Sequence, residues 1–61
     1  MGNSIKVGAK FFWNPSIFPY YIVEENKEYV SYKRDGYATK RVYRYVFEDA
    51  INSKAIEFVS A

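Results

Sequence analysis

The chain has 61 residues, with neither cysteine nor histidine and a formal net charge of +2. The missing residue types exclude disulfides, the usual zinc ligands and every catalytic arrangement that needs a Cys or a His. No apolar run approaches the roughly 20 residues of a membrane-spanning helix, and the lack of cysteine fits a reducing interior. We therefore expect residues 1–61 to form one small soluble domain in the cytoplasm, with no cofactor, metal or membrane.

A domain of this size buries little apolar surface and is only marginally stable by itself. With disulfides and zinc excluded, two sources of stability remain. One is the aromatic side chains, which make up 21% of the chain, and the other is self-association. The sequence therefore predicts a homodimer.

The N-terminal part predicts a strand and a long loop. Residues 5–12 (IKVGAKFF) alternate over a short stretch, and we expect this strand to bend at Gly8. Residues 12–19 (FWNPSIFP) follow as the loop, because two prolines exclude a central strand and Asn14-Pro15 favours a turn.

Three further strands are predicted in the middle of the chain. Residues 20–25 (YYIVEE) are β-branched and aromatic, and a tight connection at residues 26–27 leads to a strand over residues 29–34. Asp35-Gly36 is the strongest hairpin signal, since glycine takes a positive φ without penalty. Residues 39–47 (TKRVYRYVF) are predicted as the longest strand.

Two alternatives remain open for the C-terminal segment. Apolar residues at helical spacing predict an amphipathic helix over residues 48–59. Alternatively, residues 49–53 form one helical turn and residues 55–59 (AIEFV) form a short last strand. Asn52 and Ser53 compete for backbone hydrogen bonds within a helix, and no capping box supports the longer helix. The turn followed by a strand is therefore favoured.

This order of elements resembles the SH3-like small β-barrel, which runs strand, long loop, three-strand meander, helical turn and last strand. The resemblance covers nearly the whole chain but rests on segment lengths, so it transfers no functional residue. The chain is also similar to small, aromatic, cysteine-free proteins of phages and prophages. We expect a mainly β fold: a small antiparallel sheet or SH3-like barrel of four or five strands with a short C-terminal helical turn.

The residues offer little for catalysis. The acid pairs at positions 24–25 and 48–49 are sequence neighbours, which point to opposite faces of a strand. Ser31 and Lys33 share a strand face and form a conceivable Ser-Lys nucleophile, but so small a domain offers them no pocket. We predict no catalytic residue and no enzyme.

Residues 33–44 hold five basic residues and one acid, a local charge of +4, interleaved with tyrosines. Cations for phosphates and rings for base stacking are typical of nucleic-acid binders. In the predicted strand, residues 41, 43, 45 and 47 share one face. Three interpretations of this face are open. The rings form part of the core with solvated cations at its rim, or the face binds nucleic acid, or it docks an acidic protein. The alternative function is therefore a nucleic-acid-binding small barrel, with the candidate residues Lys33, Arg34, Tyr37, Lys40, Arg41 and Arg44.

The loop over residues 12–19 concentrates large apolar side chains, which either fold back as a lid or stand out as an anchor. Exposed aromatic anchors are typical of protein interfaces. The leading hypothesis is a non-enzymatic protein-binding module, a phage-type inhibitor or regulator that occludes a host protein. The candidate contact residues for the partner are Trp13, Ile17, Phe18, Tyr20 and Tyr21, and the same residues without Ile17 are the candidates for the homodimer contact.

Overall fold

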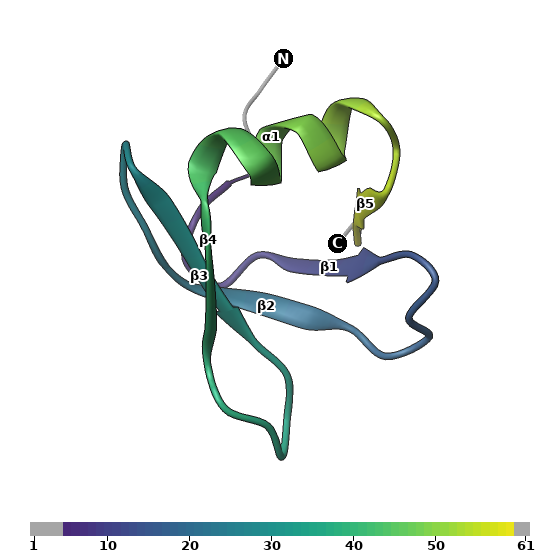
Figure 1. The fold of residues 1–61 in the computed structure, drawn as a ribbon. Helices are drawn as coiled ribbons and strands as arrows, with labels where there is room; N and C mark the ends of the chain where they lie inside the picture. Colours follow the sequence, from purple (N-terminus) through teal and green to yellow (C-terminus); the bar gives the residue numbers. More distant parts are fainter. Residues whose placement is uncertain (1–4, 60–61) are drawn as a thin grey trace.

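The computed structural model describes residues 5–59, which form one open antiparallel sheet and one helix (Figure 1). The elements in chain order are β1 (Lys10–Trp13), β2 (Tyr20–Glu25), β3 (Tyr29–Lys33), β4 (Lys40–Tyr43), α1 (Arg44–Asn52) and β5 (Ile56–Phe58). The strands follow the order β4-β3-β2-β1-β5 across the sheet. The predicted fold class, a mainly β chain with four or five strands and a short C-terminal helical turn, is confirmed: the sheet has five strands, and α1 is a helix of nine residues.

The first strand begins later than predicted. Gly8 has a φ of 93°, which takes it out of the extended conformation and turns the chain before β1. The turn is closed by a hydrogen bond from the Ala9 amide to the Lys6 carbonyl (3.0 Å), and the Gly8 amide joins it to β2 by donating to the Ile22 carbonyl (2.8 Å). Residues 5–9 therefore precede the strand, and β1 runs on through Trp13 into the segment that was predicted as loop.

The meander of β2, β3 and β4 follows the predicted order. Asn26 closes the β2–β3 turn, because its side-chain oxygen accepts hydrogen bonds from the amides of Glu28 (2.8 Å) and Tyr29 (2.9 Å). The Asp35-Gly36 turn is confirmed: the Tyr37 amide donates to the Arg34 carbonyl (3.0 Å), and Gly36 has a φ of 84°.

The prediction of one long strand over residues 39–47 is wrong. The strand ends at Tyr43, and α1 begins at Arg44. As a helix, this segment places Arg44, Phe47 and Ile51 on one side, where Phe47 is fully buried. The single strand face shared by residues 41, 43, 45 and 47 therefore does not exist.

The C-terminal alternative of a helical turn and a last strand is confirmed, although the helix begins earlier than residue 49, and a helix over residues 48–59 is wrong. Lys54 takes a φ of 69° after the helix. The Ala55 amide donates to the Ala50 carbonyl (2.8 Å) and the Lys54 amide to the Ile51 carbonyl (3.1 Å). This pair of bonds is the Schellman arrangement that terminates helices.

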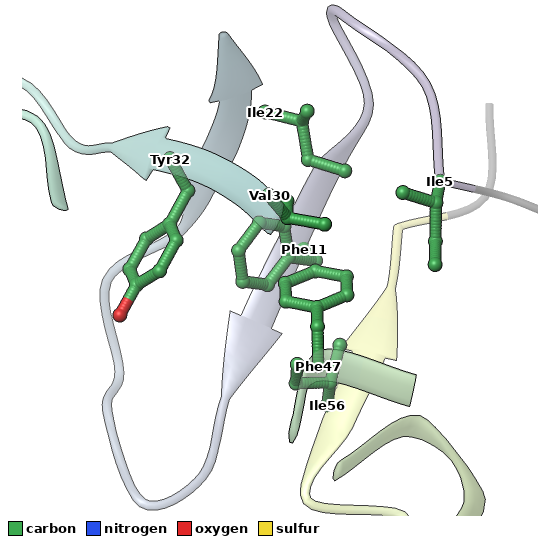
Figure 2. Packing of buried hydrophobic residues seen from close by; sticks show 7 residues of the cluster. All are labelled: Ile5, Phe11, Ile22, Val30, Tyr32, Phe47 and Ile56. Carbon is green, nitrogen blue, oxygen red and sulfur yellow. The ribbon is translucent and has the colours of Figure 1, made fainter. Parts of the chain in front are cut away.

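The core lies between the sheet and α1 (Figures 1 and 2). Its buried apolar members are Ile5, Phe11, Ile22, Val30, Tyr32, Phe47 and Ile56. Phe11 is fully buried, and Phe47 of α1 meets its ring edge-on with centroids 5.2 Å apart. Within residues 5–59, no helix is long and apolar enough to cross a membrane.

Candidate docking surface

Two connections far apart in the sequence meet beside the outer face of the sheet. The β1–β2 loop and the β3–β4 turn enclose a groove of about 290 Å³. We call it the loop–turn groove; its lining residues are Lys10, Phe18, Pro19, Tyr21, Arg34, Asp35 and Tyr37. Lys10, Tyr21 and Lys33 are register partners on three adjacent strands, so two cations flank one ring on the same face.

The β1–β2 loop is tied to the fold by hydrogen bonds at its Asn14 end and is braced by a further bond within the loop. The Asn14 amide donates to the Ala55 carbonyl (2.8 Å) and its side-chain nitrogen to the Lys54 carbonyl (3.2 Å), which ties the loop to the segment before β5. The Ser16 hydroxyl accepts from the Phe18 amide at 3.2 Å. Beyond Asn14 in this loop, Ile17 and Phe18 remain 78% and 56% exposed.

Arg34 connects the loop to the turn. Its guanidinium carbon lies 4.0 Å from the ring centre of Tyr37, 5.2 Å from that of Phe18 and 5.8 Å from that of Tyr20. A cation over an aromatic face is stabilised by about 0.5–1 kcal/mol at an exposed site. The half-buried cation therefore holds rings from both connections around itself.

A second contact joins β2 to the turn. The Tyr21 hydroxyl donates a hydrogen bond to the Asp35 carboxylate. This bond, followed by desolvation and by the negative charge of Asp35, raises the pKa of Tyr21 above its ordinary value of 10.0. Tyr21 therefore stays neutral at physiological pH and serves as a donor that restrains the groove wall.

A second aromatic patch lies around the β4 end of the sheet. Arg41 lies over the ring of Tyr29, with 4.0 Å from its guanidinium carbon to the ring centre. Tyr43 and Tyr45 stack on each other with centroids 5.7 Å apart, and both are mostly exposed. We call these four residues the β4 patch.

Arg44, a candidate for nucleic-acid binding, forms salt bridges with two glutamates. Its guanidinium donates to Glu25 (2.8 Å), Glu48 (2.9 Å) and the Asn26 carbonyl (2.9 Å). The hydrogen bonds to Glu25 and then Glu48 raise the pKa of Arg44 above its ordinary value, so the cation is permanently charged but internally neutralised. It anchors α1 to the β2–β3 turn.

The structure divides the residues predicted for protein binding into two groups. Trp13 and Tyr20 pack against the core, where the Trp13 ring lies 5.8 Å from that of Phe47. Ile17 and Phe18 stand out on the loop, and Tyr21 lines the loop–turn groove. Sequence reasoning did not single out Lys10 or Pro19 as part of this surface.

The residues predicted for nucleic-acid binding are also dispersed. Arg34 and Tyr37 belong to the loop–turn groove, whereas Arg41 belongs to the β4 patch. Lys33 lies opposite Tyr21 on the outer face, and Lys40 is exposed at the start of β4. They form no continuous basic track, since rings and acids separate them.

The acidic residues and the serine that were considered for catalysis make contacts within the fold or are buried in it. Glu25 pairs with Arg44, and Glu24 lies 3.4 Å from the Tyr29 hydroxyl. Ser31 is buried inside the sheet. In the part of the chain that the structure describes, no group of three or more His, Cys, Asp or Glu side chains is placed to hold a metal ion.

Comparison with known proteins found no match: no family model, no curated protein and no solved structure corresponds to this chain. The SH3-like and phage resemblances therefore stay predictions, and the function rests on the surface itself.

Proposed function

We propose that the chain is a non-enzymatic protein-binding module that docks a partner protein at the loop–turn groove. The observation that carries this proposal is the exposure of Ile17 and Phe18 on a loop that is tied to the fold at Asn14 and contacted by Arg34. Restraint of a loop before binding lowers the entropy lost on association. Exposed apolar side chains beside a groove are typical of interaction sites.

The chemistry of the groove specifies the partner. Phe18, Pro19 and Tyr37 offer apolar and aromatic surface, and Lys10 and Arg34 add positive charge. A segment with one large apolar side chain and a neighbouring carboxylate complements both features, with the carboxylate directed to Lys10. A small module bound in this way acts by covering its partner's surface, as a phage-type inhibitor or regulator of a host protein does.

Nucleic acid is the competing ligand, and the structure favours it less. Arg44 is neutralised by two acids, and Asp35 lies in the loop–turn groove itself. Proteins that bind single-stranded nucleic acid without sequence preference use a positively charged groove that follows the backbone. The β4 patch is also bordered by Glu28 in a second groove of about 320 Å³.

The test compares the wild-type chain with the double variant Ile17→Ser, Phe18→Ser and with the control Val7→Ser, since Val7 is also exposed (65%) but lies outside the groove. Each chain is immobilised and used to capture proteins from a cell lysate, and the captured protein is then titrated in purified form. We expect one protein to bind the wild type and the control alike, and the double variant to bind at least about tenfold more weakly.

A double variant that binds the purified partner as tightly as the wild type contradicts the proposal. The nucleic-acid function replaces it if generic DNA or RNA binds with a logarithmic salt slope of roughly −3 to −4, the value for three to five neutralised phosphates. In that case Arg41→Ala weakens binding, whereas the Ile17, Phe18 double variant does not.

A further inference from the structure

The outer edge of β4 carries backbone groups that no strand of the described chain pairs, because β4 is the terminal strand of the sheet. The Arg44 amide donates to the Glu28 carbonyl (2.9 Å), in the same register as the pair Val42↔Val30. In an antiparallel ladder, hydrogen-bonded and non-hydrogen-bonded pairs alternate. The amides and carbonyls of Val42 therefore face β3, and those of Arg41 and Tyr43 face outward.

The other edge, β5, is arranged differently. The Val59 amide donates to the Lys10 carbonyl (2.9 Å), and the Asn14 amide to the Ala55 carbonyl (2.8 Å). The same alternation directs the backbone of Glu57 toward β1 and leaves Ile56 and Phe58 on the open side. Two copies paired symmetrically through this three-residue edge bring Glu57 opposite Glu57, and like charges directly opposite are destabilising.

We propose that a second copy of this chain pairs with β4, strand to strand and antiparallel, with Val42 of both copies at the two-fold axis. This register forms hydrogen-bonded pairs between Arg41 of one copy and Tyr43 of the other, twice. The two sheets join into one continuous sheet, and the cores of both copies lie on the same face of it. The homodimer contact therefore lies at β4 and not on the β1–β2 loop.

Charge selects this register over its neighbours. A shift of the axis to Arg41 brings two guanidinium groups face to face, and a shift to Lys40 does the same for two ammonium groups. A shift to Tyr43 runs into α1, which begins at Arg44 and leaves too few extended residues. With Val42 on the axis, each Arg41 instead lies between its own Tyr29 (4.0 Å) and the partner's Tyr43.

The side chains of the edge suit this arrangement. Tyr43 and Tyr45 are 61% and 65% exposed and stacked, with an interplanar angle of 16°, so their rings already stand in order beside the edge. Val42 is half-buried and packs against the core, which gives the axis an apolar contact. A four-residue strand pair buries less area than a standard stable interface, so we expect a weak, reversible dimer.

Cysteine cross-linking tests the register directly, because the chain has no cysteine of its own. A non-hydrogen-bonded pair at the axis has its Cα atoms about 4.5 Å apart, within the range that a disulfide bridges. We expect Val42→Cys to form a disulfide dimer on mild oxidation at a rate at least about tenfold higher than Lys40→Cys, which this register places opposite Arg44. Val23→Cys, exposed on β2, reports random collision.

The variant Tyr43→Pro tests the hydrogen bonds of the edge without disturbing the fold. Tyr43 has a φ of −62°, which is the value that proline prefers, and its amide faces away from β3. We expect Tyr43→Pro to keep its β-sheet circular dichroism and to sediment as a monomer. The matched variant Tyr43→Ala retains the amide and therefore still dimerises, though more weakly than the wild type.

Three outcomes overturn the proposal. The first is a wild type that stays monomeric in sedimentation up to about 1 mM, the limit for even weak specific association. The second is a Lys40→Cys or Val23→Cys variant that cross-links as fast as Val42→Cys. The third is a folded Tyr43→Pro variant that dimerises like the wild type.

Discussion

The rings beneath α1 and the rings outside the sheet belong to the same few residue types, yet their surroundings differ. Phe11 is fully buried, and its centroid lies 5.2–6.4 Å from those of the inner rings Trp13, Tyr20, Tyr32, Phe47 and Phe58. The outer rings lie over arginines or over each other: Phe18, Tyr29, Tyr37, Tyr43 and Tyr45. The inner rings therefore hold the fold together, whereas the outer rings leave apolar surface available for a partner.

The sharpest test of this difference exchanges one ring from each group for alanine. Phe11→Ala is expected to cost about 3–5 kcal/mol, the usual loss for a buried Phe. The free energy of unfolding of a domain of this size is roughly 3–9 kcal/mol, so the variant will be partly or wholly unfolded. Phe18→Ala is expected to change the free energy of unfolding by only about 0.5 kcal/mol. Urea titration followed by circular dichroism measures both.

Phe11→Leu provides a milder control, with an expected loss smaller than that of Phe11→Ala because it removes less of the buried side chain. Equal losses for Phe11→Ala and Phe18→Ala would contradict the division into inner and outer rings, since they would show that the loop contributes as much to stability as the core.

The second test concerns the β3–β4 turn, which carries Tyr37, one of the two outer rings that lie around Arg34. Gly36 has a φ of 84°, and a Cβ atom at this position would have no neighbouring atom within 4 Å. The cost of a substitution is therefore purely that of the backbone conformation. Gly36→Val is expected to lower the free energy of unfolding by more than about 1 kcal/mol, because a β-branched residue resists positive φ. Gly36→Asn should cost less, since asparagine tolerates this region.

If Gly36→Asn destabilised the chain as much as Gly36→Val, the backbone explanation would fail. The inner rings should keep their near-ultraviolet circular dichroism in both folded variants, because the turn lies outside the core.

The smallest expected effect is the pH dependence of the free energy of unfolding, in which an inner tyrosine, Tyr32, should contribute more than an outer one, Tyr21. Burial, and then the charge of Tyr20, raises the pKa of Tyr32 above its ordinary value of 10.0. A raised pKa in the folded state means that this contribution to stability is complete below the unfolded value and is lost as the pH rises through the folded value. The free energy of unfolding of the wild type should therefore fall above about pH 10.

Tyr32→Phe should flatten this fall, and Tyr21→Phe should flatten it less, because Tyr21 owes its raised pKa to the Asp35 hydrogen bond at the surface, where solvent screens the charge. Urea midpoints measured from about pH 8 to about pH 11.5 report the slope for each variant. Parallel slopes for the wild type and Tyr32→Phe would show that ionisation of Tyr32 is not coupled to folding.

The local pattern was sufficient for much of the sheet. Residues 20–25 form β2 with the predicted limits, and the glycine at position 36 marks the hairpin turn. Both succeed because β-branched residues and a positive φ act within a few residues of the chain. The loop rich in apolar side chains was likewise evident, since composition alone identified it.

The segment after Tyr43 shows where local pattern fails. The letters TKRVYRYVF alternate as in a strand, and α1 carries no side-chain cap and no acid in its first turn. The helix is stabilised instead by Phe47 packing under Phe11 and by Arg44 reaching Glu25 on β2. Contacts across the fold outweigh weak propensity, so no window of sequence around residue 44 reveals the change.

Composition by itself determined that this chain has no disulfide and needs aromatic mass for its core, and local pattern determined the order of its elements. Only the tertiary structure decided which rings are buried, which arginines are neutralised and which residues form the loop–turn groove. Phe18 and Arg34 are neighbours because the folded sheet brings the β1–β2 loop against the β3–β4 turn. A contact between residues so far apart in the chain depends on the pairing of every strand between them, which the sequence pattern of either segment does not contain.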